Sequence, residues 1–104
     1  MWSRALVLAG LAIVAAGAPA AAATVRVTVN KLTFEPAQVS AHVGDTIEWV
    51  NVDFLAHSAT SRQKQWDLFI APSKSAHVTL TQPGEIDYYC RFHPNMVGHI
   101  SVTP

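Results

Sequence analysis

Short runs of the chain alternate between apolar and polar residues. Val25, Val27 and Val29 alternate with polar neighbours, and a later run carries Ile86 and Tyr88 on one side. A period of two residues is typical of a β-strand that buries one face. Similar runs occupy residues 39–43, 46–50, 76–80 and 100–102. The sequence therefore predicts several short strands that share a common core.

Turn signals separate these runs, and no sustained helical stripe follows residue 23. Gly44-Asp45 and Pro83-Gly84 each follow an alternating run, and such dipeptides mark turns. Turns at intervals of about ten residues between short strands are typical of a sandwich or small barrel. We therefore predict an all-β fold, a small Greek-key β-sandwich or barrel. Residues 62–73 have a less clear period, and we expect a loop or a short helical turn there.

The first 23 residues have the composition of a secretory signal peptide. Residues 1–4 include an arginine, residues 5–16 are mostly apolar, and residues 17–23 consist of Gly, Ala and Pro. Segments of this kind, in this order, precede a cleavage site. We expect cleavage after Ala23, with a shift of one or two residues left open, and export to the periplasm. The alternative, an uncleaved membrane anchor, is disfavoured because Pro19 interrupts a run rich in Ala and Gly.

The remaining segment, residues 24–104, is long enough for one small domain. The chain has seven Lys and Arg residues and seven Asp and Glu residues, and of these only Arg4 lies in the first 23. The domain is therefore close to neutral and has no basic tract, so nucleic acid is not an expected partner. The single cysteine, Cys90, excludes a disulfide within the chain. A lone thiol in an exported protein calls for an explanation, and metal binding is one.

Cys90 begins a short segment, Cys90-Arg91-Phe92-His93-Pro94-Asn95-Met96, that contains three soft or borderline metal ligands. Thiolate, imidazole and thioether together suit copper better than zinc, calcium or magnesium. Blue-copper electron-transfer sites use two histidines, one cysteine and a weak axial methionine. The segment supplies Cys90, His93 and Met96, so a second histidine is still needed. The alternative is that Cys90 and Met96 only fill the core, as free Cys and Met commonly do.

The period of the strands also predicts where these side chains lie. Cys90 shares a face with Tyr88, so we expect its thiol at the edge of the core, at the end of a strand. His93 and Met96 are expected in the loop that follows, before Gly98 restarts a strand. A fourth ligand must then come from a neighbouring strand or loop.

Among the other histidines, His57 has the most favourable position. It follows a strand-like stretch that runs into a loop, and it precedes an expected strand at residues 58–61. His42 and His77 alternate with apolar neighbours, so we expect them to face solvent. His99 is expected at the surface or partly buried.

Five stretches of the chain form one ordered pattern: Phe34-Glu35-Pro36, residues 43–51, His57, Pro83-Gly84 and residues 88–96. This pattern resembles that of the cupredoxins, the type 1 blue copper proteins, and the resemblance covers essentially all of residues 24–104. Two residues between Cys and His and two between His and Met form the short ligand loop of the amicyanin-like members. The resemblance implies that one copper ion is bound by His57, Cys90, His93 and Met96, with Met96 as the axial ligand.

Two positions depart from the family's usual pattern. Ser58 follows the upstream histidine, where the family usually has Asn to tie the two ligand loops together by hydrogen bonds. Ala56 precedes this histidine, where amicyanin-like members often have Pro. Neither change removes a ligand, but the shorter reach of Ser58 puts the rigidity of the site and its reduction potential in question.

The resemblance implies a mobile one-electron carrier that cycles between Cu(II) and Cu(I). The implied partners are a periplasmic dehydrogenase and a c-type cytochrome, and we expect a monomer with no stable membrane insertion after cleavage. The alternative is a protein that delivers or stores copper. That role favours several exposed Met and His ligands, whereas Met96 is the only methionine besides Met1. We do not expect an enzyme, because Cys90 and His93 lie in one turn without an obvious group to orient them for nucleophilic catalysis.

His93 is the ligand that we expect to reach the surface, because it follows a strand end and precedes a turn stiffened by proline. Phe92 and Val97 either belong to the core or join an apolar patch around its edge. The residues that could form this patch are Leu55, Ala56, Phe92, Pro94 and Val97. The charged residues expected to tune encounters with a partner are Arg62, Lys64 and Arg91.

Overall fold

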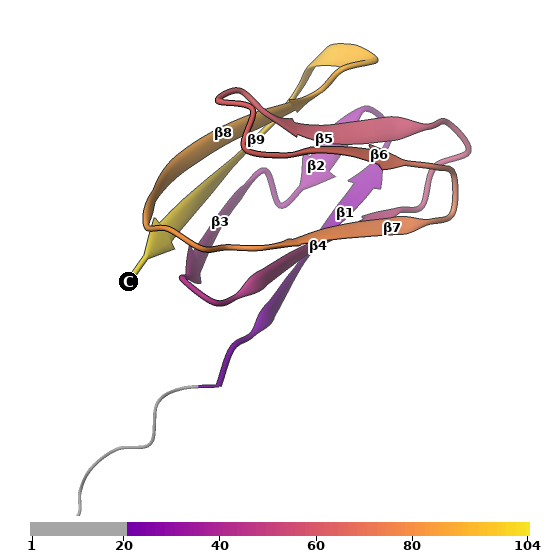
Figure 1. Ribbon diagram of the computed structural model, residues 1–104. Coiled ribbons are helices and arrows are strands. Elements are labelled where there is room, and N and C mark those ends of the chain that lie inside the picture. The colour runs from indigo at the N-terminus through magenta and orange to yellow at the C-terminus, as the bar shows by residue number, and fades with distance from the viewer. Residues whose placement is uncertain (1–20) are drawn as a thin grey trace, which may run out of the picture.

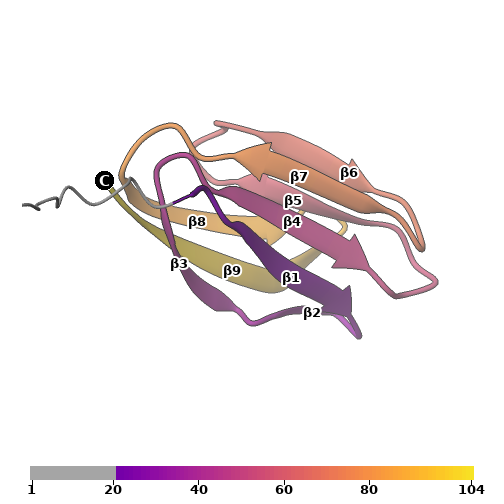
Figure 2. The same ribbon diagram turned by 90° about the horizontal axis from the view of Figure 1, so that it is seen from below.

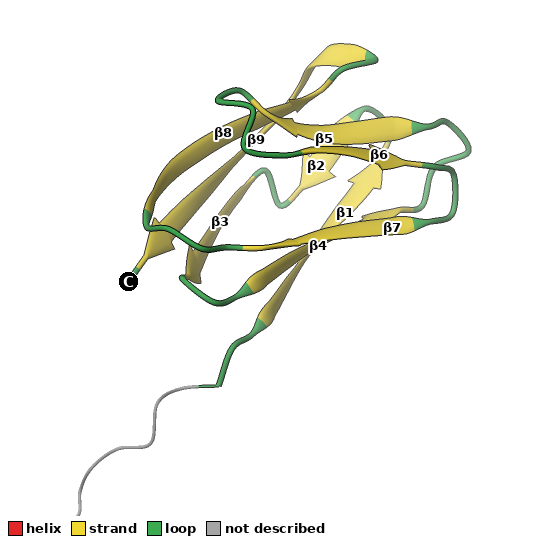
Figure 3. Cartoon of the chain, in the orientation of Figure 1, coloured by secondary structure: helices red, strands yellow, loops and turns green. Residues whose placement is uncertain are grey.

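The computed structural model describes residues 21–104. The prediction of a signal peptide therefore falls mainly on residues outside the described part of the chain. Residues 21–104 contain strands and no helix (Figure 3), and none of their elements is a helix long and apolar enough to cross a membrane. The strands are β1 (Thr24–Asn30), β2 (Thr33–Glu35), β3 (Gln38–His42), β4 (Thr46–Asn51), β5 (His57–Ser61), β6 (Asp67–Ile70), β7 (Ser75–Thr79), β8 (Gly84–Cys90) and β9 (His93–Thr103).

The strands form two sheets that face each other (Figures 1 and 2). One sheet has the order β2-β1-β4-β7, and the other has the order β3-β9-β8-β5-β6. The pairs β1–β4 and β3–β9 are parallel, whereas the other neighbouring strands are antiparallel. The prediction of an all-β sandwich is confirmed.

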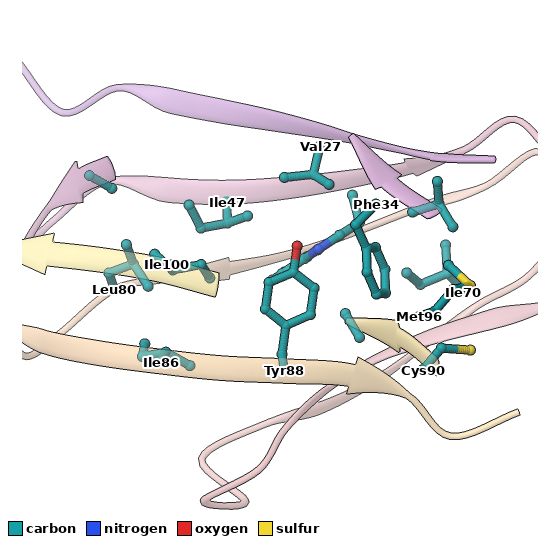
Figure 4. Packing of buried hydrophobic residues seen from close by; sticks show 14 of the residues in the cluster. Val27, Phe34, Ile47, Ile70, Leu80, Ile86, Tyr88, Cys90, Met96 and Ile100 are labelled. Carbon is teal, nitrogen blue, oxygen red and sulfur yellow. The ribbon is translucent and has the colours of Figure 1, made fainter. Parts of the chain in front are cut away.

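The core between the sheets contains the inward-facing residues of the alternating runs (Figure 4). Tyr88 is 1% exposed, and its ring packs edge-on against Phe34 at 4.8 Å and Trp49 at 5.4 Å between centroids. Burial raises the pKa of Tyr88 to about 12. A Cβ atom at Gly98, the partner of Tyr88 on β9, would lie 2.2 Å from the tyrosine ring. Glycine is therefore required at this position for the close approach of β9 to the ring.

One expected loop or helical turn is instead a strand. Residues 67–70 form β6, which pairs with β5 in antiparallel register. Trp66 and Leu68 pack against the core and Ile70 is fully buried, but Phe69 between them is 57% exposed. An aromatic residue on the solvent face conceals the alternation, which is why the sequence pattern did not reveal this strand.

The expectation that His93 and Met96 lie in a loop is also wrong, because both belong to β9. Only Arg91 and Phe92 form the turn between β8 and β9. Cys90 pairs with His93, whereas Tyr89 pairs with Val97, so residues 94–96 have no counterpart on β8. Extra residues of this kind form a bulge that bends the strand and redirects a side chain. Met96 belongs to this bulge, and its side chain is buried in the core with 1% exposure.

Candidate metal centre

Three strand ends meet at one end of the second sheet. His57 is the first residue of β5, Cys90 the last of β8 and His93 the first of β9. Pairing of β5 with β8, and of β8 with β9, brings these ends together. His57 and Cys90 are fully buried, whereas His93 is partly exposed. The structure therefore places these three predicted ligands side by side, with His93 nearest the solvent.

The donor atoms of these residues have spacings that suit one bound metal ion. The ligand atoms of His57, Cys90 and His93 all lie within 4.8 Å of one another. Cys90 Sγ lies 3.8 Å from His57 Nδ1 and 3.8 Å from His93 Nδ1. With bond lengths as in zinc sites, a thiolate and an imidazole on one ion are separated by roughly 3.7 Å. The thiolate and two imidazoles are also the equatorial donor set of a blue-copper site. The residues present therefore fit a copper ion.

Asp53 fixes the tautomer of His57. The Asp53 carboxylate accepts a hydrogen bond from His57 Nε2 at 3.1 Å, so Nδ1 is left without a proton and faces Cys90. The side chain of Asp53 is only 8% exposed. The hydrogen bond from His57 is the largest cause that lowers the pKa of Asp53, and the main-chain N–H groups of Phe54 and Lys31 act in the same direction. A carboxylate that orients a metal-binding histidine also raises its basicity as a ligand.

Asn51 holds the loop that carries Asp53. Asn51 is 1% exposed, and its amide nitrogen donates to the carbonyl oxygens of Leu55 at 2.8 Å and Ile70 at 3.1 Å. Its side-chain oxygen accepts from the main-chain N–H of Asp53 at 2.9 Å. The sequence pattern points to neither Asn51 nor Asp53 as part of the site. The available signal was a carboxylate four residues before the candidate histidine.

Cys90 is held at the end of the core-facing side of β8, as the alternation predicted. The main-chain N–H of Ser58 donates to Cys90 Sγ at 3.4 Å. Met96 belongs to the same core cluster as Cys90, and Figure 4 shows both residues toward the same end of the core.

The remaining histidines do not join this group. Within residues 21–104, the cluster of metal-ligating side chains contains none of His42, His77 and His99. The side chain of His42 is 72% exposed, as expected. His99 is partly exposed and lies between two carboxylates, with Nδ1 2.8 Å from Asp87 and Nε2 2.7 Å from Glu85.

Exposed apolar side chains occur in the segments next to the candidate ligands. Phe92 is 47% exposed and Val97 is 49% exposed, so the alternative that these two belong to the core is wrong. Leu55 is 40% exposed. Two further exposed apolar residues were not predicted from the sequence: Phe54, which is 84% exposed, and Phe69, which is 57% exposed and packs edge-on against Phe92 at 6.1 Å. We call Phe54, Leu55, Phe69, Phe92 and Val97 the apolar patch.

The fold and this cluster of donors are those of a small copper-binding β-sandwich, and comparisons with known proteins agree. A family model described as a cupredoxin-like domain matches residues 3–102. A plastocyanin of Synechococcus sp. (strain JA-2-3B'a(2-13)) is 31% identical over 94% of this chain and 87% of its own. An amicyanin of Paracoccus denitrificans is 27% identical over 91% of this chain and 81% of its own.

Solved structures show the same fold. An amicyanin variant in the reduced state superposes with a TM-score of 0.67 at 27% identity, over 76% of this chain and 81% of its own. A purple cupredoxin from Nitrosopumilus maritimus superposes with a TM-score of 0.70 at 20% identity, over 76% of this chain and 99% of its own. The chain belongs to the cupredoxin-like family. Its cofactor is one copper ion of the type 1 class.

Proposed function

We propose that this protein is a blue-copper electron carrier, with His57, Cys90, His93 and Met96 as the ligands of its copper ion. The observation that carries the proposal is the group of two imidazoles and one thiolate, gathered within 4.8 Å at the end of paired strands. Copper bound by such a set supplies one-electron exchange between Cu(II) and Cu(I).

The way the protein holds these side chains favours electron transfer over copper delivery or storage. Asp53 restrains His57, the Ser58 N–H restrains Cys90, and His93 and Met96 lie on a strand paired with β8. Ligands restrained in this way move little when the charge of a bound ion changes, so little reorganisation opposes the transfer. Delivery and storage require ligands that exchange readily, whereas His57, Cys90 and Met96 are each at most 1% exposed. Because Cys90 and His93 are both assigned to copper in this proposal, neither is available as a nucleophile, and we propose no enzymatic activity.

The partly exposed His93 is the proposed exit for the electron. The apolar patch gives a partner a small surface from which water is easily displaced, which suits the weak and brief contacts of redox proteins. Because some relatives are amicyanins, we propose a dehydrogenase as donor and a c-type cytochrome as acceptor. We further propose that the protein acts as a monomer.

We also propose export to the periplasm, on the basis of the signal-peptide pattern of residues 1–23. Ala23 makes two hydrogen bonds to the folded domain: its N–H donates to Asp45 at 2.9 Å and its carbonyl accepts from Thr46 at 2.9 Å. A cut after residue 22, within the shift left open above, would keep these contacts and place the new ammonium group beside the Asp45 carboxylate. The intact mass of the protein recovered from the periplasm tests this, and a mass that includes residues 1–20 contradicts it.

Visible absorption and EPR spectroscopy after addition of Cu(II) test the proposed function. The wild-type protein should bind one Cu(II) ion and show an intense thiolate-to-copper charge-transfer band, because Cys90 supplies the only thiolate. Cys90→Ser should abolish the band, and His57→Gln should abolish or strongly alter it. Met96→Leu should remain coloured with a shifted spectrum, because axial ligation is weak.

His77→Gln is the matched control, since it removes an exposed imidazole on β7 in the other sheet. It should leave the spectrum unchanged. A colourless Cu(II) complex of the wild-type protein would overturn the proposed function.

A further inference from the structure

Ser58 contacts Cys90 and the first residue of the turn that follows it. Its main-chain N–H donates to Cys90 Sγ, and its hydroxyl oxygen accepts from the main-chain N–H of Arg91 at 2.8 Å. Ser58 is fully buried. The short side chain of Ser58 thus links β5 to the β8–β9 turn, because its hydroxyl oxygen accepts a hydrogen bond directly from the main-chain N–H of Arg91.

The hydroxyl of Ser58 belongs to a longer chain of hydrogen bonds. Because its oxygen accepts from Arg91, its proton can be donated to Thr60 Oγ1, which lies 2.9 Å away. Thr60 Oγ1 in turn donates to the Asp67 carboxylate at 2.7 Å. Thr60 is 6% exposed, and buried hydroxyls that are fully partnered in this way reinforce one another.

Arg91 closes the chain into a ring. Its Nε donates to the same Asp67 oxygen at 2.8 Å. The pKa of Asp67 is lowered, mainly by the hydrogen bond from Arg91 and then by that from Thr60. An ionised carboxylate only accepts hydrogen bonds. Asp67 therefore makes Thr60 the donor to its carboxylate, which leaves Thr60 to accept from Ser58 and Ser58 to accept from the main-chain N–H of Arg91. The network therefore connects an exposed residue of β6 to the main chain beside the thiolate.

We infer that Thr60 and Asp67 are positioning residues for the copper ligands: they orient the Ser58 hydroxyl and thereby hold the turn between Cys90 and His93. This inference rests on the proposed function of the site. The network takes the place of the side-chain amide that the family usually has at the position of Ser58. Neither Thr60 nor Asp67 belongs to the group of three metal-ligating side chains, so their effect on copper passes through Ser58 and Arg91.

Thr60→Val tests the inference with little change in volume. In metal-free protein, the main-chain N–H of Arg91 should exchange with solvent about three- to tenfold faster, as expected for the loss of about one net hydrogen bond. The Cu(II) form should stay coloured but show a changed EPR hyperfine splitting, because the thiolate is less firmly held. Asp67→Ala should act in the same direction, and the effects of the two changes should not add when combined, because they interrupt one network.

Two matched controls separate this network from general effects. Thr46→Val removes a hydroxyl paired with Thr79 in the other sheet at 3.3 Å, and Glu48→Ala removes a partly exposed partner of Arg26 at 3.2 Å. Both should leave the exchange of Arg91 and the EPR spectrum unchanged. If Thr60→Val fails to fold, Asp67→Ala at the exposed end of the network carries the test.

The outcomes distinguish this inference from the proposed function. Unchanged exchange of Arg91 in Thr60→Val and Asp67→Ala overturns the inference. Faster exchange with an unaltered EPR spectrum also overturns it, because the network is then only structural. A colourless Cu(II) complex of the wild-type protein would overturn the proposed function. Hydrogen exchange of the Arg91 N–H in the metal-free protein would still show whether the network holds the turn.

Discussion

The carboxylate of Asp53 controls the chemistry of His57 from outside the ligand set. It is largely shielded from solvent and holds the Nε2 proton, so the lone pair of Nδ1 points toward Cys90. A negative charge close to a redox ion also favours the more highly charged state of that ion. Asp53 is therefore expected both to orient the ligand and to stabilise Cu(II) relative to Cu(I).

We predict that Asp53→Asn raises the reduction potential, because the amide can still accept a hydrogen bond but carries no charge. Asp53→Ala should raise it as well and should also weaken copper binding by about 10- to 100-fold, the usual effect of removing such a partner. Cyclic voltammetry and competitive copper titration measure the two effects. Glu48→Gln, which removes a partly exposed charge in the other sheet, is the control, and a potential equal to that of the control would contradict the prediction.

At this scale, the candidate ligands are easier to recognise in the sequence than the residues that support them. The spacing of Cys90, His93 and Met96 is visible in the chain, since all three belong to one short hairpin. The roles of Asn51 and Asp53 depend on how residues 52–56 curl back on β4, which periodicity does not encode. The ring through Ser58 depends on the register of three strands, so it could not be read from the sequence.

At the scale of elements, the β8–β9 hairpin carries a cluster of charges on its solvent face. His99 of β9 lies between Asp87 and Glu85 of β8, and Ser101 also donates to Glu85 at 3.0 Å. The hydrogen bond to Asp87, followed by that to Glu85, raises the pKa of His99. The pKa of Glu85 is lowered, mainly by the hydrogen bond from His99. The paired residue on β3 is Gln38, which carries no charge.

These shifts predict how the stability of the hairpin depends on pH. The contribution of protonated His99 is complete below its unfolded pKa of 6.5 and is lost as pH rises through the raised folded value. The contribution of ionised Glu85 is complete above its unfolded pKa of 4.5 and is lost as pH falls through the lowered folded value. The difference in urea midpoint between wild type and His99→Gln, measured on metal-free protein, should be greatest between these two unfolded values. It should shrink above neutral pH, and a difference independent of pH would contradict the prediction.

The strands with regular alternation were predicted correctly, whereas the two departures have clear physical causes. Phe69 places a large apolar side chain on the solvent side of β6 and so removes the expected pattern. The bulge at residues 94–96 allows β9 to begin at His93 and still bury Met96. A period of two residues cannot reveal such an insertion, because the register changes within the strand.

At the scale of the whole molecule, the fold gathers the apolar patch and two lysines at the metal-binding end. Lys31 follows β1 and its N–H contacts Asp53, while the carbonyl of Lys74 accepts from the main chain of Asn51. Neither lysine has an ion-pair partner among residues 21–104. Arg62 and Lys64, which were expected to tune encounters, follow the end of β5 that is farther from His57, and the Arg62 guanidinium lies over the Tyr89 ring at 4.6 Å. Arg91 lies at the metal-binding end, next to Cys90, but its side chain is paired with the Asp67 carboxylate.

This arrangement predicts two separable effects on electron exchange with a protein partner such as a c-type cytochrome, measured by stopped-flow spectroscopy. Leu55→Glu should slow exchange by about tenfold, equivalent to about 1.4 kcal/mol, without changing the copper spectrum, because it places an unpaired charge in the docking surface. Lys31→Glu combined with Lys74→Glu should instead change the dependence of the rate on salt between about 10 mM and about 150 mM, where screening increases strongly. Arg62→Glu combined with Lys64→Glu is the matched control, since it reverses the same number of charges after the end of β5 that is farther from His57. Equal effects of the two charge reversals would show that a partner does not dock at the metal-binding end, and a wild-type rate for Leu55→Glu would exclude the apolar patch as the docking surface.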